Sequence, residues 1–129
     1  MSSPAELIKI VDTVFDPDGD KKQIFYLRPR GQATILYKVW LYLDGPSMPF
    51  INKVTYILHP TFPNPERAVE KTVSNPDCEM VIWAWGTFTV QAVVEDKQGK
   101  LTRLERYLTF DKQIEKAKKS GVQFTEIPG

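Results

Sequence analysis

The stretch TFTVQAVVEDKQGKLTRLERYLTF, residues 87–110, decides the fold. In its first half, apolar side chains occupy every second position: Phe88, Val90, Ala92 and Val94. A turn-forming sequence at residues 96–100 follows, and then Leu104, Leu108 and Phe110 share one face of a second segment. Alternation with a period of two on both sides of a short turn is typical of a β-hairpin.

Outward from this hairpin, further strand-like segments are bounded by turn residues. They lie at residues 7–15, 23–27, 33–43, 54–58 and 80–82, the last leading into residues 83–86. A polar stretch reaching Asn75 and Pro76 separates the fourth from the fifth. About seven short strands at this spacing predict an all-β, immunoglobulin-like β-sandwich.

One segment, residues 112–120, is expected to be helical, with Gly121 as its C-terminal stop. Its lysines favour a solvated helix at the edge of the domain. We therefore expect residues 1–129 to form a single domain with a C-terminal helical extension at about 111–121.

The balance of charges argues against several classes of ligand. The 129 residues include 17 basic and 16 acidic side chains, for a net charge of +1. Proteins that bind nucleic acid through its phosphates normally carry a clear basic excess, so no nucleic acid is expected as the main ligand. No apolar run approaches the roughly 20 residues that span a bilayer, so no membrane partner is expected.

The cysteine and histidine content argues against a disulfide and against a zinc site. The single cysteine, Cys78, excludes an internal disulfide, and a single histidine, His59, leaves no His/Cys zinc cluster. Residues 1–6 lack the features of a secretion signal. We expect no metal, no cofactor and a cytoplasmic location, or a nuclear one if the source is eukaryotic.

None of the remaining motifs indicates a catalytic site. The acidic residues 16–20 superficially resemble a calcium loop, but Gly19 is at the fourth position and Leu27 stands where a glutamate is required, so a polar turn is expected. No nucleophile occurs with an oriented base. The chain is therefore not expected to be an enzyme.

Two aromatic loops are the strongest functional candidates. One contains His59, Thr61 and Phe62 among prolines that stiffen it. The other contains Trp85 before a core strand. At one end of a sandwich, Phe62 and Trp85 would form a slot for a flat amide, with hydrogen bonds from the Thr61 hydroxyl and the Trp85 N–H. In the alternative interpretation both rings only cap the core and His59 is structural.

The sequence VTYILHPTFPNPER, residues 54–67, followed by AWGTF, residues 84–88, resembles the YEATS domain family. That family has a strand ending in Leu-His, a Ser/Thr-Phe-Pro loop and a later Gly-Trp/Tyr-Gly/Ala-x-Phe loop. The resemblance, from about residue 37 to 110, implies an immunoglobulin-like sandwich that binds acylated lysine. It places the acyl slot at seven residues, His59, Thr61, Phe62, Ala84, Trp85, Gly86 and Phe50.

Within that slot the resemblance gives each residue a role. Phe62 and Trp85 are the walls, Thr61 is the hydroxyl donor to the acyl amide, His59 is the histidine beneath, and Phe50 is a supporting aromatic. Ala84 replaces the family's usual glycine. The short loops and the long final hairpin are closer to the prokaryotic branch.

The expected function is a module that binds an acetyl- or crotonyl-type lysine on a peptide or protein. The alternative is an interaction or sensory module of a prokaryotic signalling or defence system, which contacts a partner protein through its sheet edges and reads no acyl-lysine.

Overall fold

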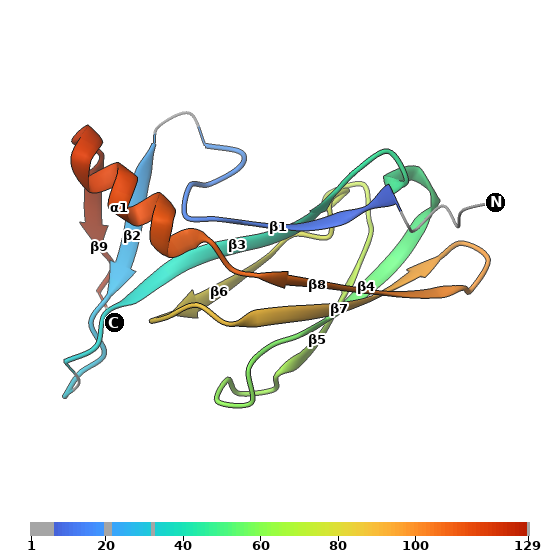
Figure 1. Cartoon of the computed structure of the whole chain (residues 1–129), viewed down its shortest axis with the longest axis horizontal. Coiled ribbons are helices and arrows are strands. Elements are labelled where there is room, and N and C mark those ends of the chain that lie inside the picture. The colour runs from blue at the N-terminus through green and yellow to red at the C-terminus, as the bar shows by residue number, and fades with distance from the viewer. Residues whose placement is uncertain (1–6, 20–21, 32, 129) are drawn as a thin grey trace. The chain divides into compact units, whose positions relative to one another are not determined.

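The computed structural model describes residues 7–19, 22–31 and 33–128 (Figure 1). The N-terminal residues 1–6 and Asp20 of the acidic turn, both discussed above, lie outside the described residues. The strands within this part of the chain are β1 (Lys9–Thr13), β2 (Gln23–Leu27), β3 (Leu36–Asp44), β4 (Ile51–Ile57), β5 (Glu66–Glu70), β6 (Met80–Ala84), β7 (Thr89–Asp96), β8 (Leu101–Tyr107) and β9 (Gln123–Glu126). The helices are η2 (Met48–Phe50), a 3₁₀ turn, and α1 (Phe110–Ser120).

The strands form two hydrogen-bonded sheets. One has the order β5-β4-β7-β8, and the other has the order β1-β3-β2-β9 with β6 also paired to β3. The described residues cluster into two compact units. The first comprises residues up to Val11, Tyr42–Met80 and Phe88–Tyr107, and the second comprises Asp12–Leu41, Val81–Thr87 and residues from Leu108 onward.

In the first unit, the four-stranded sheet is antiparallel throughout. The predicted alternation is confirmed, because one face of its central strands is fully buried: Val54, Tyr56, Val90, Ala92 and Val94. Burial of such apolar side chains is the main favourable term in folding, at about 25 cal/mol per Å² removed from water. This sheet carries the first candidate loop, between β4 and β5.

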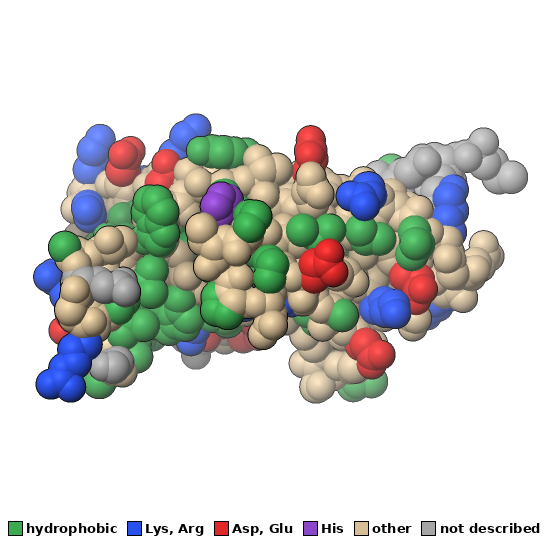
Figure 2. Space-filling view, turned by 90° about the horizontal axis from the view of Figure 1, so that it is seen from below, with side chains coloured by type: hydrophobic (Ala, Val, Ile, Leu, Met, Phe, Trp, Pro, Cys, Tyr) green, Lys and Arg blue, Asp and Glu red, His purple; other side chains and the backbone are tan. Residues whose placement is uncertain are grey.

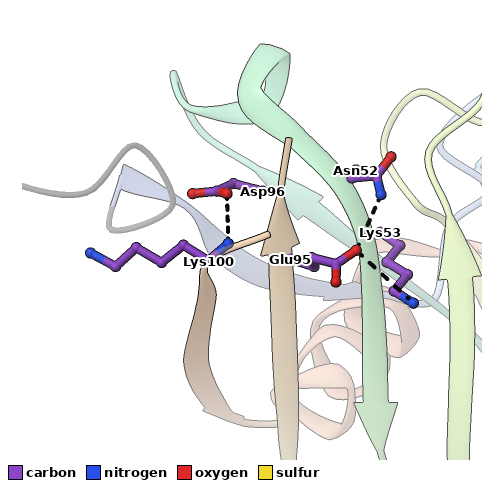
Figure 3. A network of polar contacts seen from close by, with 5 residues as sticks. All are labelled: Asn52, Lys53, Glu95, Asp96 and Lys100. Carbon is purple, nitrogen blue, oxygen red and sulfur yellow. Dashed lines mark hydrogen bonds and ion pairs between the residues drawn. The ribbon is translucent and has the colours of Figure 1, made fainter. Parts of the chain in front are cut away.

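The turn of the predicted hairpin is closed by Asp96 (Figure 3). Its N–H donates to the carbonyl of Lys100 at 3.0 Å, and its carboxylate accepts the N–H groups of Gln98 and Lys100, each at 2.9 Å. Gly99 supplies the positive φ of 83° that this turn needs. Next to the turn, Glu95 accepts a hydrogen bond from Asn52 at 3.1 Å.

In the second unit, β2 pairs antiparallel with β3 and parallel with β9. Helix α1 begins two residues earlier than predicted, at Phe110, and ends as predicted at Gly121, which has a φ of 74°. The buried carboxylate of Asp12 accepts the N–H of Thr109 at 2.7 Å, and the Gln113 amide donates to the Asp12 carbonyl at 2.9 Å. These bonds attach the start of the helix to β1.

Two strands were absent from the sequence-based expectation. β5 lies in the polar stretch that follows the first candidate loop, and β9 follows the helix. Both are edge strands of four or five residues with at least two exposed side chains each, so neither shows a buried apolar period.

Candidate functional site

The first candidate loop, residues 58–65, is a tight excursion between β4 and β5. The N–H of Leu58 donates to the carbonyl of Pro65 at 2.8 Å, which holds the two ends of the loop together. At its tip, the N–H of Phe62 donates to the carbonyl of His59 at 3.0 Å. The prolines and these bonds fix the backbone, so the side chains at the tip are positioned before any ligand arrives.

His59 and Thr61 form a polar pair at this tip. Nδ1 of His59 lies 2.8 Å from the Thr61 hydroxyl and accepts the Thr61 backbone N–H at 3.3 Å. Since Nδ1 accepts the backbone N–H, the neutral ring is assigned the tautomer with its proton on Nε2, and the hydroxyl proton also points at Nδ1. The Thr61 oxygen therefore keeps its lone pairs available for an incoming N–H group, which favours an acceptor role over the donor role that the resemblance implies.

Both side chains of the pair are exposed. In Figure 2 the chain's one histidine, drawn in purple, reaches the surface. A ligand therefore has access to the polar pair from solvent.

The rings of Phe62 and His59 both contact Phe88, the residue just before β7. The Phe62 and Phe88 centroids are 5.3 Å apart with an interplanar angle of 49°, and the His59 and Phe88 centroids are 6.1 Å apart at 64°. Such tilted and edge-on pairs contribute about 0.5–1.5 kcal/mol each beyond burial. The three rings, with Phe62 and Phe88 only half-buried, make an aromatic shelf beside the Thr61 hydroxyl.

Arg67 on β5 holds the same loop from its other side. Its guanidinium lies 5.9 Å from the Phe62 ring centroid and donates to the carbonyls of Pro63 at 3.0 Å and Asn64 at 3.2 Å. Asn64 has a positive φ of 48°. Arg67 thus fixes both the Phe62 ring and the descending half of the loop.

The second candidate loop follows β6 in the second unit. Ala84 is the last residue of β6 and is buried, whereas the side chain of Trp85 is 69% exposed. Gly86 has open space around its Cα, with no heavy atom within 4 Å of an added Cβ. Because Ala84 is an ordinary buried strand residue, the alanine in place of the family's glycine is accommodated.

The structure thus brings His59, Thr61 and Phe62 together in the first unit, with Phe88 and Arg67 as contacts that sequence reasoning did not assign to the site. Phe88 was already in the quoted AWGTF motif, and that was the signal available for it. Ala84, Trp85 and Gly86 form one continuous segment of the second unit. The pairing of Phe62 with Trp85 across a ligand stays a prediction.

Phe50 does not lie next to the first candidate loop. Phe50 ends η2 immediately before β4, whereas His59 follows β4 at its other end. A seven-residue strand separates them by roughly 25 Å, since a strand rises about 3.4 Å per residue. The Phe50 carbonyl instead accepts the N–H of Lys97 at 2.9 Å, beside the β7–β8 turn.

Within the described residues, no group of three or more histidine, cysteine or acidic side chains is placed to hold a metal ion. No helix in that part of the chain has both the length and the apolar character needed to cross a membrane.

Comparison with solved structures defines the class of this fold. The yeast Yaf9 protein matches with a TM-score of 0.53 and 23% identity, over 81% of this chain and 65% of that one. The Yaf9 YEATS domain recognising an H3K122suc peptide matches with a TM-score of 0.52 and 22% identity, over 83% and 71%. The same domain bound to H3K27ac matches with a TM-score of 0.51 and 23% identity, over 80% and 75%. At these identities the likeness establishes the fold, and the predicted immunoglobulin-like β-sandwich is confirmed.

The sequence profile of the prokaryotic YEATS domain matches residues 36–109. The chain therefore belongs to the prokaryotic YEATS domain family, as the two loops predicted. It is also 36% identical over 66 residues to the transcription initiation factor TFIID subunit 14 of Schizosaccharomyces pombe. That alignment covers 50% of this chain and 25% of the relative, so the chain matches about a quarter of that protein's length.

Proposed function

We propose that this domain binds an acylated lysine side chain, and that Phe62 and Trp85 are aromatic residues that contact its acyl group. The observation that carries the proposal is the fixed His59–Thr61 pair beside the aromatic shelf of His59, Phe62 and Phe88. An acylated lysine offers one neutral amide and a short flat or apolar tail. Those are the two chemical features that a hydroxyl oxygen next to stacked rings is suited to bind.

The polar half of the site selects the amide. The Thr61 oxygen, whose proton is directed to Nδ1 of His59, accepts the amide N–H of the ligand. The backbone N–H of Trp85 donates to the acyl carbonyl. An unmodified lysine presents an ammonium group with no carbonyl acceptor, so it gains neither this hydrogen bond nor the stacking of a flat amide.

The exposure of Trp85 supports the apolar half of the site. A tryptophan buries 150–250 Å² in a typical packed position. Its side chain is instead 69% exposed at a loop that belongs to the family motif. At about 25 cal/mol per Å², covering this ring with a ligand contributes several kcal/mol.

The solved relatives give independent support for the ligand class. Yaf9 YEATS domains are described with H3K122suc and H3K27ac peptides, which carry two different acyl groups on lysine. The shared fold and family extend that ligand class to this chain as a proposal. For a prokaryotic family member, the protein that carries the acylated lysine need not be a histone.

The test is a titration with three peptides of one sequence, in which the central lysine is unmodified, acetylated or crotonylated. Trp40 is buried and Trp83 is half-buried, so Trp85 dominates the solvent-sensitive fluorescence. Saturable changes with the acylated peptides only are expected. Their retention in Trp83→Phe and their loss in Trp85→Ala would assign the signal. If no peptide changes the spectrum of the folded protein, the proposal fails.

A further inference from the structure

Strand β8 forms one edge of the four-stranded sheet, and its backbone hydrogen bonds follow a regular pattern. β8 pairs with β7 in one uninterrupted register, from Thr89 opposite Tyr107 to Glu95 opposite Leu101. One pair further along, the N–H of Asp96 bonds to the carbonyl of Lys100. Hydrogen-bonded and non-hydrogen-bonded pairs alternate along an antiparallel ladder. The backbone groups of residues 101, 103 and 105 therefore point away from β7, toward an edge that pairs with no other strand among the described residues.

The exposed side chains on this edge also follow a regular pattern of chemical types. Alternate residues of β8 are exposed, and in chain order they are apolar, positive, negative and apolar: Leu101, Arg103, Glu105 and Tyr107. Leu101 and Tyr107 are 61% and 63% exposed. The series is self-complementary when it is reversed about Leu104, because each charge then meets its opposite and the two apolar ends meet each other.

We propose that this edge binds a second copy of the chain, with the two β8 strands antiparallel and a two-fold axis at Leu104. Arg103 of each copy then lies opposite Glu105 of the second copy, in pairs that exchange both backbone hydrogen bonds. Leu101 lies opposite Tyr107 of the second copy. The two four-stranded sheets join into one continuous sheet.

The other edge of the sheet lacks this complementarity. The exposed residues of β5 are Glu66, Ala68 and Glu70. Reversal about Ala68 sets Glu66 opposite Glu70 of a second copy, and like charges directly opposite each other are destabilising. An unprotected edge strand is a template for pairing, and charge repulsion of this kind prevents it. Self-pairing is thus disfavoured at β5 and favoured at β8.

Charge reversal tests the proposal by sedimentation equilibrium over a concentration series. Arg103→Glu puts like charges opposite each other in two symmetric pairs, so the dimer dissociation constant rises about tenfold or more. Glu105→Arg does the same, and the double exchange R103E/E105R restores the wild-type constant. Lys118→Glu, a charge reversal at an exposed position on α1, is the matched control and leaves the constant unchanged. The proposal is overturned if the wild-type chain is monomeric at every concentration. It is also overturned if neither charge reversal changes the dimer dissociation constant.

A crosslink tests the position of the axis separately. Non-hydrogen-bonded partners have Cα atoms about 4.5 Å apart, within the range that a disulfide spans. Under mild oxidation, Leu104→Cys should give a covalent dimer in high yield. Ala68→Cys on β5 should stay monomeric, and the buried Cys78 does not interfere. Equal crosslinking of the two variants would overturn pairing through β8.

Discussion

The hydroxyl of Thr61 lies 2.8 Å from Nδ1 of His59, and the same nitrogen accepts the Thr61 backbone N–H. Two donors converge on one ring nitrogen, so the hydroxyl oxygen is turned outward as an acceptor. Under the proposed function, that oxygen receives the amide N–H of the acylated lysine.

Replacing Thr61 by valine keeps the shape of the side chain and removes this acceptor. We expect Thr61→Val to weaken binding of the acetylated peptide by about tenfold, because the amide N–H is then desolvated without a partner. Isothermal titration measures the change. Thr61→Ser keeps the hydroxyl and should bind within about threefold of wild type. Equal affinities for the valine and serine variants would contradict a role for this hydroxyl.

The two aromatic positions should separate binding from stability. Trp85 is largely exposed, so Trp85→Ala should change the free energy of unfolding by about 0.5 kcal/mol or less while abolishing detectable peptide binding. Phe88 contacts two rings, so Phe88→Ala should lower both binding and stability, the latter by about 2–4 kcal/mol. Urea unfolding and titration of the same samples measure both quantities.

Trp85→Phe is the control for the Trp85→Ala variant. Trp85→Phe retains an aromatic face and should retain part of the affinity. If Trp85→Ala instead unfolds the domain, then the ring caps the core and the alternative interpretation of the two loops gains support.

The parts of the fold that the sequence predicts are those with a local pattern. Residues 87–110 alternate on both sides of a turn, and the structure places β7 and β8 there. Residues 23–27 match β2 at both ends. β5 escaped prediction because three of its five side chains are exposed, and β9 because its parallel partner β2 lies about a hundred residues earlier in the chain. Neither pairing leaves a short-range signal.

In the candidate site too, the features that are local in the chain could be predicted, and the contacts between distant residues could not. His59, Thr61 and Phe62 are neighbours in the chain, and the loop that they form was predictable as a unit. The sequence places Phe88 in the strand alternation and in the AWGTF motif, but it does not show which rings a half-buried aromatic contacts. The distance between Phe50 and His59 could not be predicted from their spacing in the chain, because it depends on the extended strand β4 that lies between them.

Stability should fall in alkaline solution because of the buried pair Tyr56 and Cys78. The Tyr56 hydroxyl donates to the Cys78 carbonyl at 2.8 Å. Burial raises the pKa of the Cys78 thiol to about 11, and burial also raises the pKa of the Tyr56 phenol. Both groups ionise more easily when unfolded. These two groups therefore leave stability unchanged below about pH 8.5 and lower it above that pH, with Cys78 alone accounting for about 2–3 kcal/mol by pH 11.

Urea unfolding at several pH values between 7 and 11 measures this loss. The control is Cys78→Ala, which removes the thiol and should flatten the curve between about pH 9 and 11 while leaving the contribution of Tyr56. A slope identical to that of wild type would mean that Cys78 titrates normally in the folded chain.

Among the described glycines, Gly45, after β3, has the least room for a side chain. An added Cβ would overlap the carbonyl oxygen of Leu7, and the φ of 147° is one that other residues rarely adopt. Since the obstacle is backbone, it cannot rotate away. Gly45→Ala should lower the free energy of unfolding by about 2 kcal/mol or more.

Gly99 has a φ of 83° but open space around it, so Gly99→Ala should cost only about 1–2 kcal/mol, from backbone strain alone. Urea unfolding of the two variants compares them directly. A smaller loss for Gly45→Ala than for Gly99→Ala would show that the segment before β1 moves aside, and that its approach to Gly45 contributes little to the fold.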